Sequence, residues 1–305
     1  MNVEWMRGCA TALVTPFGPD ESVDLGAHRR LVERQIEGGV RLLVPCGTTG
    51  ESVTMTAAER ESVVVATVEA ADGRARVIAG TGSNSTAAAV EQSRRAAELG
   101  ADAVLVVAPY YNKPTQEGLY RHFMAVAEAV PETPVVLYNV PGRTASNLLP
   151  ETTLRLAREA PNVAAVKEAS GDLAQVMALM RGRPEGFLVL SGDDALTLAL
   201  IALGADGLVS VASNEAPGPV SRMVEAALAG RWDEARAAHY RLLPLMEVNF
   251  AETSPGPVKA AMAMMGLLEE VLRLPLVPAS GKTREEVRAV LEGLGLLEES
   301  RHVSA

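Results

Sequence analysis

Residues 134–167 read PVVLYNVPGRTASNLLPETTLRLAREAPNVAAVK and contain the repeat that decides the fold. Two short apolar runs, 134–138 and 163–167, are separated by a segment at 150–158 whose apolar residues recur at helical spacing. Each run is apolar at both alternating positions, which is typical of parallel strands that are buried on two faces. The stretch therefore predicts a strand, a helix and a second strand parallel to the first.

The same alternation extends in both directions from this stretch. The other apolar runs are 9–14, 41–44, 76–79, 103–107, 187–190 and 207–211. The other segments with helical spacing are 25–38, 56–71, 85–99, 115–129, 172–181, 195–203 and 217–229. Glycines that are typical of helix ends are Gly39, Gly100, Gly204 and Gly230. Eight strand–helix units predict a closed parallel barrel, the (β/α)₈ or TIM barrel of the α/β class.

An open, doubly wound sheet is the rival fold. It would place a glycine-rich phosphate turn after the first strand, where this chain reads Thr15-Pro16-Phe17. Only 4% of the 305 residues are aromatic and 48% are hydrophobic, so we expect an aliphatic core. The sequence favours the barrel.

The strand pattern stops near residue 230. Helical spacing continues at 232–246, 256–265 and 283–291, with proline-containing joints at 254–257 and 274–280. We therefore expect a barrel domain at 1–230 and a helical C-terminal domain at 231–305.

Composition excludes several classes of partner. The formal net charge is -10 without any basic cluster, which argues against nucleic acid and anionic membranes as partners. The four histidines are scattered, and no spacing resembles a metal site, so we expect neither a metal nor another cofactor. Cys9 and Cys46 lie in apolar runs, which predicts two buried free thiols. No secretory signal and no membrane-spanning apolar run is visible, so we expect a cytoplasmic location.

Active sites of such barrels lie at the carboxyl ends of the strands, which draws attention to Lys167. It ends the apolar run Val163-Ala164-Ala165-Val166. A desolvated ammonium has a lowered pKa, and the neutral amine can attack a ketone to form an imine. An ion pair with Glu168, or an extended side chain at the rim, is an equally simple interpretation.

Four further residues at strand ends have both a chemical and an ordinary interpretation. Tyr138 can shuttle protons or can be a core tyrosine. Thr48 and Thr49 in a Gly-Thr-Thr-Gly turn can bind a carboxylate or can serve the turn alone. Arg143, after a Pro-Gly turn, can hold a carboxylate with its guanidinium or can be solvated.

Asp193 and Asp194 could be taken for a metal pair. They follow Ser-Gly at the start of a predicted helix, where an acidic capping residue is expected. We favour the capping role.

Four separated strings at strand ends resemble the dihydrodipicolinate synthase family, within the class I aldolase-like superfamily of N-acetylneuraminate lyase. They are GTTGES at 47–52, YYNKP at 110–114, YNVPGRT at 138–144 and KEA at 167–169. The likeness runs from about residue 8 through the last barrel strand and extends to the helical C-terminal region. It implies a lyase with a (β/α)₈ barrel and no cofactor.

The resemblance also implies catalytic roles. Lys167 would form the Schiff base with pyruvate, and Tyr138 would be the central proton shuttle. Thr48 and Tyr111 would complete a hydroxyl relay, with Tyr111 reaching in from the neighbouring subunit of a homotetramer built as a dimer of dimers.

Substrate-binding residues follow from the same resemblance. Thr49 would hold the pyruvate carboxylate, with the backbone of Val209 close by. Arg143 would bind the carboxylate of L-aspartate 4-semialdehyde, the aldehyde partner, and the product would be 4-hydroxy-tetrahydrodipicolinate.

One departure concerns inhibition by lysine, which many bacterial members bind at the tight-dimer interface. The matching polar residues are Ser52, Asn84 and Tyr110. The family's histidines and glutamate are replaced here by Ala57, Arg60 and Ala88. A lysine ammonium would lose its carboxylate partner, so we expect weak or absent inhibition.

Two alternatives remain. A related lyase acting on N-acetylneuraminate or a 2-keto-3-deoxy sugar acid would use the same Lys167 and Tyr138, although Arg143 and the Thr48-Thr49 pair favour the synthase. A catalytically inactive barrel that senses 2-keto acids is disfavoured, because the lysine and the relay hydroxyls are all present.

Overall fold

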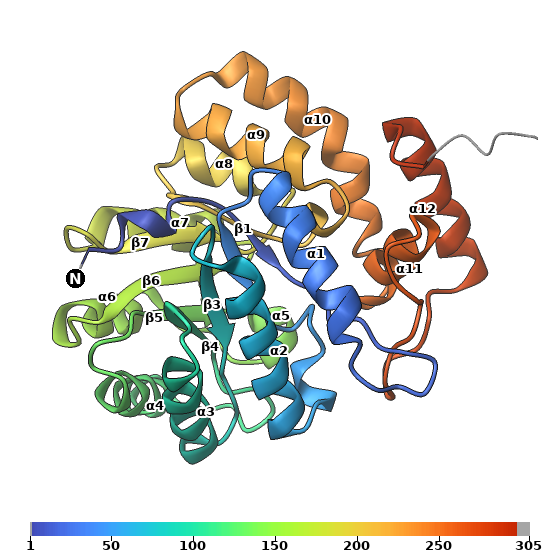
Figure 1. The fold of residues 1–305 in the computed structure, drawn as a ribbon. Coiled ribbons are helices and arrows are strands. Elements are labelled where there is room, and N and C mark those ends of the chain that lie inside the picture. Colours follow the sequence, from blue (N-terminus) through green and yellow to red (C-terminus); the bar gives the residue numbers. More distant parts are fainter. Residues whose placement is uncertain (1, 298–305) are drawn as a thin grey trace, which may run out of the picture.

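The computed structural model describes residues 2–297, and its strands close into a barrel. Each strand pairs in parallel with its neighbour, and β8 pairs with β1 to close the ring (Figure 1). The strands are β1 (Gly8–Ala12), β2 (Leu42–Val44), β3 (Arg76–Gly80), β4 (Ala103–Val107), β5 (Val135–Asn139), β6 (Val163–Glu168), β7 (Leu188–Ser191) and β8 (Gly207–Ser210). The predicted (β/α)₈ barrel is confirmed, and the open sheet is excluded.

Helices between successive strands cover the outside of the barrel. They are α1 (Leu25–Glu37), α2 (Ala57–Ala71), α3 (Thr86–Glu98), α4 (Gln116–Ala129), α6 (Pro150–Glu159), α7 (Leu173–Gly182), α8 (Thr197–Ala202) and α9 (Pro217–Leu228). Asp24 caps α1 by accepting the Ala27 N–H at 2.8 Å, and Thr56 and Glu59 form a capping box on α2. Gly39 has a φ of 88°, and the other three predicted glycines also have positive φ.

Four short elements are absent from the sequence-based prediction. They are the single turn α5 (Pro141–Thr144) and the 3₁₀ helices η1 (Glu4–Met6), η2 (Ser52–Thr54) and η3 (Ala212–Asn214). Isolated turns of this length are unstable, so they depend on contacts with the rest of the protein. Two of them, η2 and α5, follow strand ends that carry predicted site residues.

Aliphatic side chains fill the interior of the barrel. Buried members of this cluster include Ala10, Leu42, Ile78, Leu105, Val136, Ala165, Leu188, Leu190 and Val209. Tyr138 belongs to the same cluster. The barrel is therefore a packed core, and its chemistry is confined to the strand ends.

Three helices follow the barrel: α10 (Trp232–Val248), α11 (Gly256–Met264) and α12 (Gly281–Leu294) (Figure 1, orange to red). One buried cluster joins Met223 of α9 to Leu242 of α10 and Val287 of α12, so the core continues past residue 230. The division into domains at 1–230 and 231–305 stays a prediction, and its ends, Met1 and residues 298–305, lie outside the described residues.

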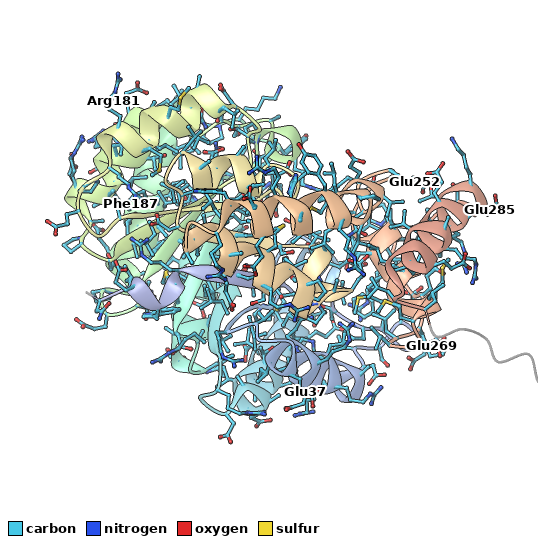
Figure 2. All side chains as sticks on the ribbon, turned by 90° about the horizontal axis from the view of Figure 1, so that it is seen from above. Glu37, Arg181, Phe187, Glu252, Glu269 and Glu285 are labelled. Carbon is cyan, nitrogen blue, oxygen red and sulfur yellow. The ribbon has the colours of Figure 1, made fainter. Side chains whose placement is uncertain are left out.

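Polar side chains cover the outer faces of the helices (Figure 2). Arg181 and Glu285, for example, lie at opposite ends of the molecule in that view. Cys9 and Cys46 are buried and unpaired, as predicted, and burial raises the pKa of Cys46 to about 12. Within residues 2–297, no helix combines the length and the apolar character needed to cross a membrane.

Candidate active site

Tyr138 and Lys167 stand next to each other at the carboxyl ends of neighbouring strands. Tyr138 of β5 is paired with Lys167 of β6, one residue before each strand ends. Side chains alternate between the two faces of a strand, so these two share one face, while Asn139 and Glu168 share the other. Because Tyr138 belongs to the interior cluster, the face it shares with Lys167 is the inside of the barrel.

The amine of Lys167 is held against an aromatic ring. The residue is 5% exposed, and its Nζ lies 4.2 Å from the centroid of the Tyr138 ring. In the part of the chain that the structure describes, no hydrogen bond or ion pair occupies this amine. Burial excludes the interpretation of Lys167 as a rim lysine.

The neighbouring carboxylate, that of Glu168, forms hydrogen bonds on the other face of the strand. It accepts hydrogen bonds from the Ser170 N–H at 2.7 Å, from Asn139 Nδ2 at 3.1 Å and from Gln175 Nε2 at 3.1 Å. The ion pair between Lys167 and Glu168 that the sequence left open is therefore not formed. Glu168 instead fixes the outer face of β5 and β6 behind the two inward-facing side chains.

A cavity of about 350 Å³ lies at this end of the barrel. Thr48, Tyr138 and Arg143 line it, which brings three of the predicted site residues together. Lys167 does not line the cavity. Tyr138 does, and it also contacts the amine, so its ring links the cavity to Lys167.

The remaining predicted residues lie outside this wall. Thr49 and Val209 are buried, with 6% and 2% of each exposed, and the side chain of Val209 packs inside the barrel. Tyr111 is 88% exposed and has a φ of 73°. Within residues 2–297 of one chain, the hydroxyls of Thr48, Tyr138 and Tyr111 form no hydrogen bonds with one another.

Arg143 lies on the single helical turn α5 and not in an open loop. Pro141 starts the turn, and Thr144 ends it, with its hydroxyl donating to the Ser146 carbonyl at 2.9 Å. Arg143 is exposed at the cavity, and no carboxylate among residues 2–297 pairs with it. The guanidinium is therefore available to an anionic ligand.

Comparison with known proteins identifies the family to which this barrel belongs. The profile of the dihydrodipicolinate synthetase family matches residues 5–294. The chain belongs to this family. Relatives named 4-hydroxy-tetrahydrodipicolinate synthase are 55% identical in Koribacter versatilis, over 96% of this chain and 97% of the relative, and 53% identical in Acidobacterium capsulatum, over 97% and 98%.

A solved structure agrees with this assignment. A monomeric variant of dihydrodipicolinate synthase superposes with a TM-score of 0.94 at 46% identity, covering 96% of this chain and 98% of the variant. The resemblance stated from the four sequence strings is confirmed. As a member of the dihydrodipicolinate synthetase family, the chain is an enzyme, a carbon–carbon lyase of the class I aldolase type.

Both carboxylates of the acidic pair after β7 accept hydrogen bonds from backbone N–H groups. The expected capping role is not formed, because the N-cap of α8 is Leu196 and no side chain caps this helix; Asp193 instead accepts the Leu196 N–H at 3.2 Å in the turn before it. Asp194 is buried and accepts the Val211 N–H at 2.8 Å, which fastens the end of β8. Within residues 2–297, no group of acidic, histidine and cysteine side chains is arranged to hold a metal ion.

The C-terminal region contributes to the wall of the cavity, which the sequence did not predict. Residues from that region in the cavity wall are Thr253, Ser254, Pro275 and Leu276. They lie in or beside the two proline-containing joints at 254–257 and 274–280. Those joints were the available signal, but nothing in their sequence indicates contact with strand ends more than 100 residues away.

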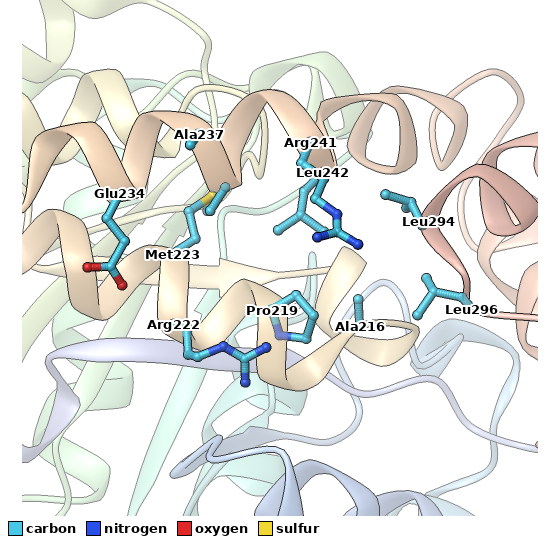
Figure 3. Close-up of a pocket in the computed structure, with 11 residues that line it drawn as sticks. Ala216, Pro219, Arg222, Met223, Glu234, Ala237, Arg241, Leu242, Leu294 and Leu296 are labelled. Atoms are coloured by element: carbon cyan, nitrogen blue, oxygen red, sulfur yellow. The ribbon is translucent and has the colours of Figure 1, made fainter.

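A second hollow lies outside the barrel, between α9, α10 and the end of α12 (Figure 3). Its volume is about 420 Å³, and Arg222 and Arg241 border it. It contains no lysine, tyrosine or threonine in its wall. This hollow therefore contains none of the predicted site residues.

Proposed function

We propose that this chain condenses pyruvate with L-aspartate 4-semialdehyde to give 4-hydroxy-tetrahydrodipicolinate, a step of diaminopimelate and lysine biosynthesis. The supporting observation is the buried amine of Lys167 against Tyr138, beside a cavity that holds Arg143. We place the enzyme in the cytoplasm, as its sequence suggests.

The first stage is imine formation. The neutral Lys167 amine attacks C2 of pyruvate, and the C2 oxygen leaves as water after proton transfers. Tyr138, whose ring centroid lies 4.2 Å from the amine, is the group proposed for these transfers. Thr48 and the Tyr111 of a neighbouring subunit complete the proposed relay, which is consistent with the exposure of Tyr111 on its own chain.

The second stage forms the carbon–carbon bond. The protonated imine withdraws electrons, so C3 loses a proton and the resulting enamine attacks the aldehyde carbon. The amino group of the semialdehyde then attacks C2 and expels the Lys167 amine, which closes the ring and restores the enzyme. One water leaves in the complete reaction.

Anionic groups of both substrates need positive or hydrogen-bonding partners in a chain of net charge -10. Arg143 faces the cavity without an acidic partner among residues 2–297 and suits the carboxylate of the semialdehyde. Thr49 and the backbone of Val209 are proposed to hold the pyruvate carboxylate.

The proposed assembly is a homotetramer. Besides Tyr111, exposed apolar side chains lie on α7, at the end of α8 and on α10: Leu173, Met177, Leu203 and Tyr240. α7 and α8 share a buried cluster, and α8 and α10 border one surface hollow, so these three helices are neighbours. Sedimentation of the purified protein tests the assembly, and a monomer would contradict it.

Two measurements test the proposed activity. The protein is incubated with pyruvate, reduced with borohydride and weighed, and an adduct is expected on Lys167. The Lys167→Arg variant is the control and should remain unmodified. An unmodified wild-type protein would exclude the imine mechanism.

The acceptor is tested separately in a coupled assay. Turnover is expected with L-aspartate 4-semialdehyde. Cleavage of N-acetylneuraminate without that turnover would assign the chain to the sugar-acid lyases instead.

A further inference from the structure

The turn that carries Thr48 and Thr49 is tied to the C-terminal region through a buried ion pair. Glu51, at the end of this turn, has a left-handed φ of 53° and a fully buried side chain. Its carboxylate pairs with Lys259 of α11, whose side chain is also fully buried. Lys259 also donates to the Val271 carbonyl at 2.9 Å and lies 4.2 Å over the Phe17 ring.

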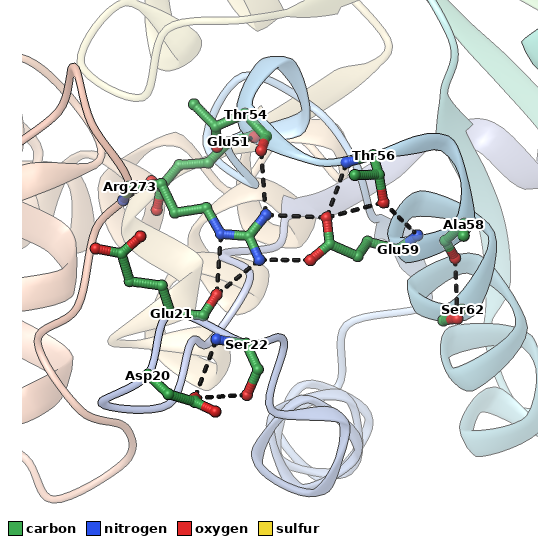
Figure 4. Close-up of polar contacts among 10 residues, drawn as sticks. All are labelled: Asp20, Glu21, Ser22, Glu51, Thr54, Thr56, Ala58, Glu59, Ser62 and Arg273. Carbon is green, nitrogen blue, oxygen red and sulfur yellow. Dashed lines mark hydrogen bonds and ion pairs between the residues drawn. The ribbon is translucent and has the colours of Figure 1, made fainter.

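Arg273 forms a second link to the same turn (Figure 4). Its backbone N–H donates to Glu51 Oε2 at 3.2 Å. Its guanidinium donates to the Thr54 carbonyl at 3.1 Å, to the Glu21 carbonyl at 2.6 Å and to the Glu59 carboxylate at 3.0 Å. Arg273 therefore binds three separate segments of the barrel.

Short contacts carry this anchoring to the site residues. The Glu51 N–H donates to the Thr48 carbonyl at 3.1 Å, and the Thr54 hydroxyl donates to the Glu51 carbonyl at 3.0 Å. On the other side of the turn, the Thr15 hydroxyl donates to the Gly50 carbonyl at 2.7 Å. The backbone of Glu51 is therefore hydrogen-bonded directly to Thr48.

The same C-terminal segment also forms the facing wall of the cavity. Pro275 and Leu276, which directly follow Arg273 and Leu274, line it together with Thr48. Arg273 thus fixes the position of one wall relative to the other. Both walls belong to the space in which the proposed aldehyde would meet the imine.

A fully buried ion pair is a weak source of stability, because desolvation offsets the attraction and apolar replacements are often as stable. The ion pair does, however, fix the relative positions of its two partners, and apolar residues would not reproduce this fixed geometry. We propose that Lys259 and Arg273 are positioning residues that set the Thr48–Thr49 turn against the cavity wall, so that the C-terminal helices form part of the active site. This inference rests on the proposed function of Thr48 and Thr49.

The decisive variant replaces the ion pair with apolar residues, Glu51→Leu together with Lys259→Met. We expect a folded protein whose rate of imine trapping and kcat/KM for pyruvate fall by about tenfold or more, because small misplacements of catalytic groups are costly. Arg273→Lys, which keeps a charge but loses the planar guanidinium, should show an intermediate loss. If the double variant does not fold, the activity of Arg273→Lys tests the positioning role instead.

Arg183→Gln is the matched control. Arg183 pairs with the buried Asp206, which precedes β8 at the opposite end of the barrel. This variant should lose thermal stability but keep kcat/KM within about twofold of wild type, since it leaves the catalytic geometry intact.

Crystal structures of wild type and the double variant give a readout that does not depend on activity. A displacement of Thr48 by about 1 Å supports the proposal, since such shifts matter for catalysis. An unmoved turn, or wild-type imine trapping in the folded variants, would overturn it. A wild-type protein that forms no adduct would instead refute the proposed function.

Discussion

Gly192 leaves the space that the Lys167 side chain occupies. A Cβ added at Gly192 would lie 3.0 Å from Lys167 Cε, 3.1 Å from Lys167 Cγ and 2.7 Å from Ala169 Cβ. Both the lysine stem and the strand end beside it would have to shift. Gly192 therefore determines where the amine stands relative to Tyr138.

Gly192→Ala should slow imine formation by about tenfold or more, because the amine is displaced from its reactive position. The loss of stability should stay near about 1–3 kcal/mol, as is usual for overpacking. Borohydride trapping and chemical denaturation measure the two effects. Gly293→Ala, at a site in α12 with no neighbour within 4 Å of the added Cβ, is the control and should leave trapping unchanged.

Inhibition by lysine is the second property decided by single residues. Ala57 and Arg60 of α2 and Ala88 of α3 are the positions at which the family resemblance implies histidines and a glutamate in lysine-sensitive members. We expect weak or absent inhibition by millimolar lysine, because Ala88 cannot supply the carboxylate that would pair with the ammonium. A clear fall in rate in the coupled assay would contradict this. Ala88→Glu should move the enzyme towards sensitivity.

Whole strands and helices were predictable wherever local pattern and burial agree. Runs such as 163–166 are apolar at every position because barrel strands are covered on both faces, and Thr56 with Glu59 signalled the start of α2. α5 was not predictable, because one turn is held by contacts such as that between Thr144 and Ser146. The placement of Lys167 beside Tyr138 was predictable from strand order.

The walls of the site were less predictable than its strand ends. Arg273 binds Glu21, Thr54 and Glu59, which precede it by more than 200 residues, and no sequence period reports such contacts. The exposure of Tyr111 likewise depends on how a loop folds. The sequence therefore predicted candidate reactive groups at the strand ends but not the contacts that hold those groups in position.

The contact between α1 and α2 makes stability depend on pH. His28 Nε2 lies 2.8 Å from the Thr67 hydroxyl, which itself donates to the Val63 carbonyl at 2.7 Å. Thr67 must therefore accept, so His28 carries its proton on Nε2, and its buried Nδ1 has no partner among the described residues. Burial lowers the pKa of His28 to about 4.

A histidine whose folded pKa is depressed remains neutral while the unfolded chain takes up a proton. Stability should therefore fall as the pH drops from about 6.5 towards 4, by up to about 3 kcal/mol for His28. Urea denaturation at pH 7 and pH 5 measures this. His28→Gln should have a lower free energy of unfolding than wild type at pH 7, but this free energy should fall less between pH 7 and pH 5. An equal fall for both proteins would refute the role of His28 in the pH dependence. His122, whose pKa burial also lowers to about 4, should behave alike.

At the scale of the molecule, one chain supplies most but not all of the proposed site. Thr48, Tyr138 and Arg143 share the cavity, and Lys167 lies directly behind Tyr138. Tyr111 stands outside it, almost fully exposed. If Tyr111 belongs to the relay, it must act on a second copy of the chain, and association becomes a requirement of catalysis.

Mixing two inactive variants tests this requirement. Lys167→Arg removes the amine but keeps Tyr111, whereas Tyr111→Phe keeps the amine and removes the hydroxyl. A mixed dimer contains one complete site if Tyr111 acts across the interface, because the Tyr111→Phe chain keeps its own Lys167 and receives Tyr111 from its partner. Equal mixing with free exchange makes half of the dimers mixed, so about a quarter of wild-type activity should return. If Tyr111 acts within its own chain, mixing restores nothing, and activity stays at the average of the two variants.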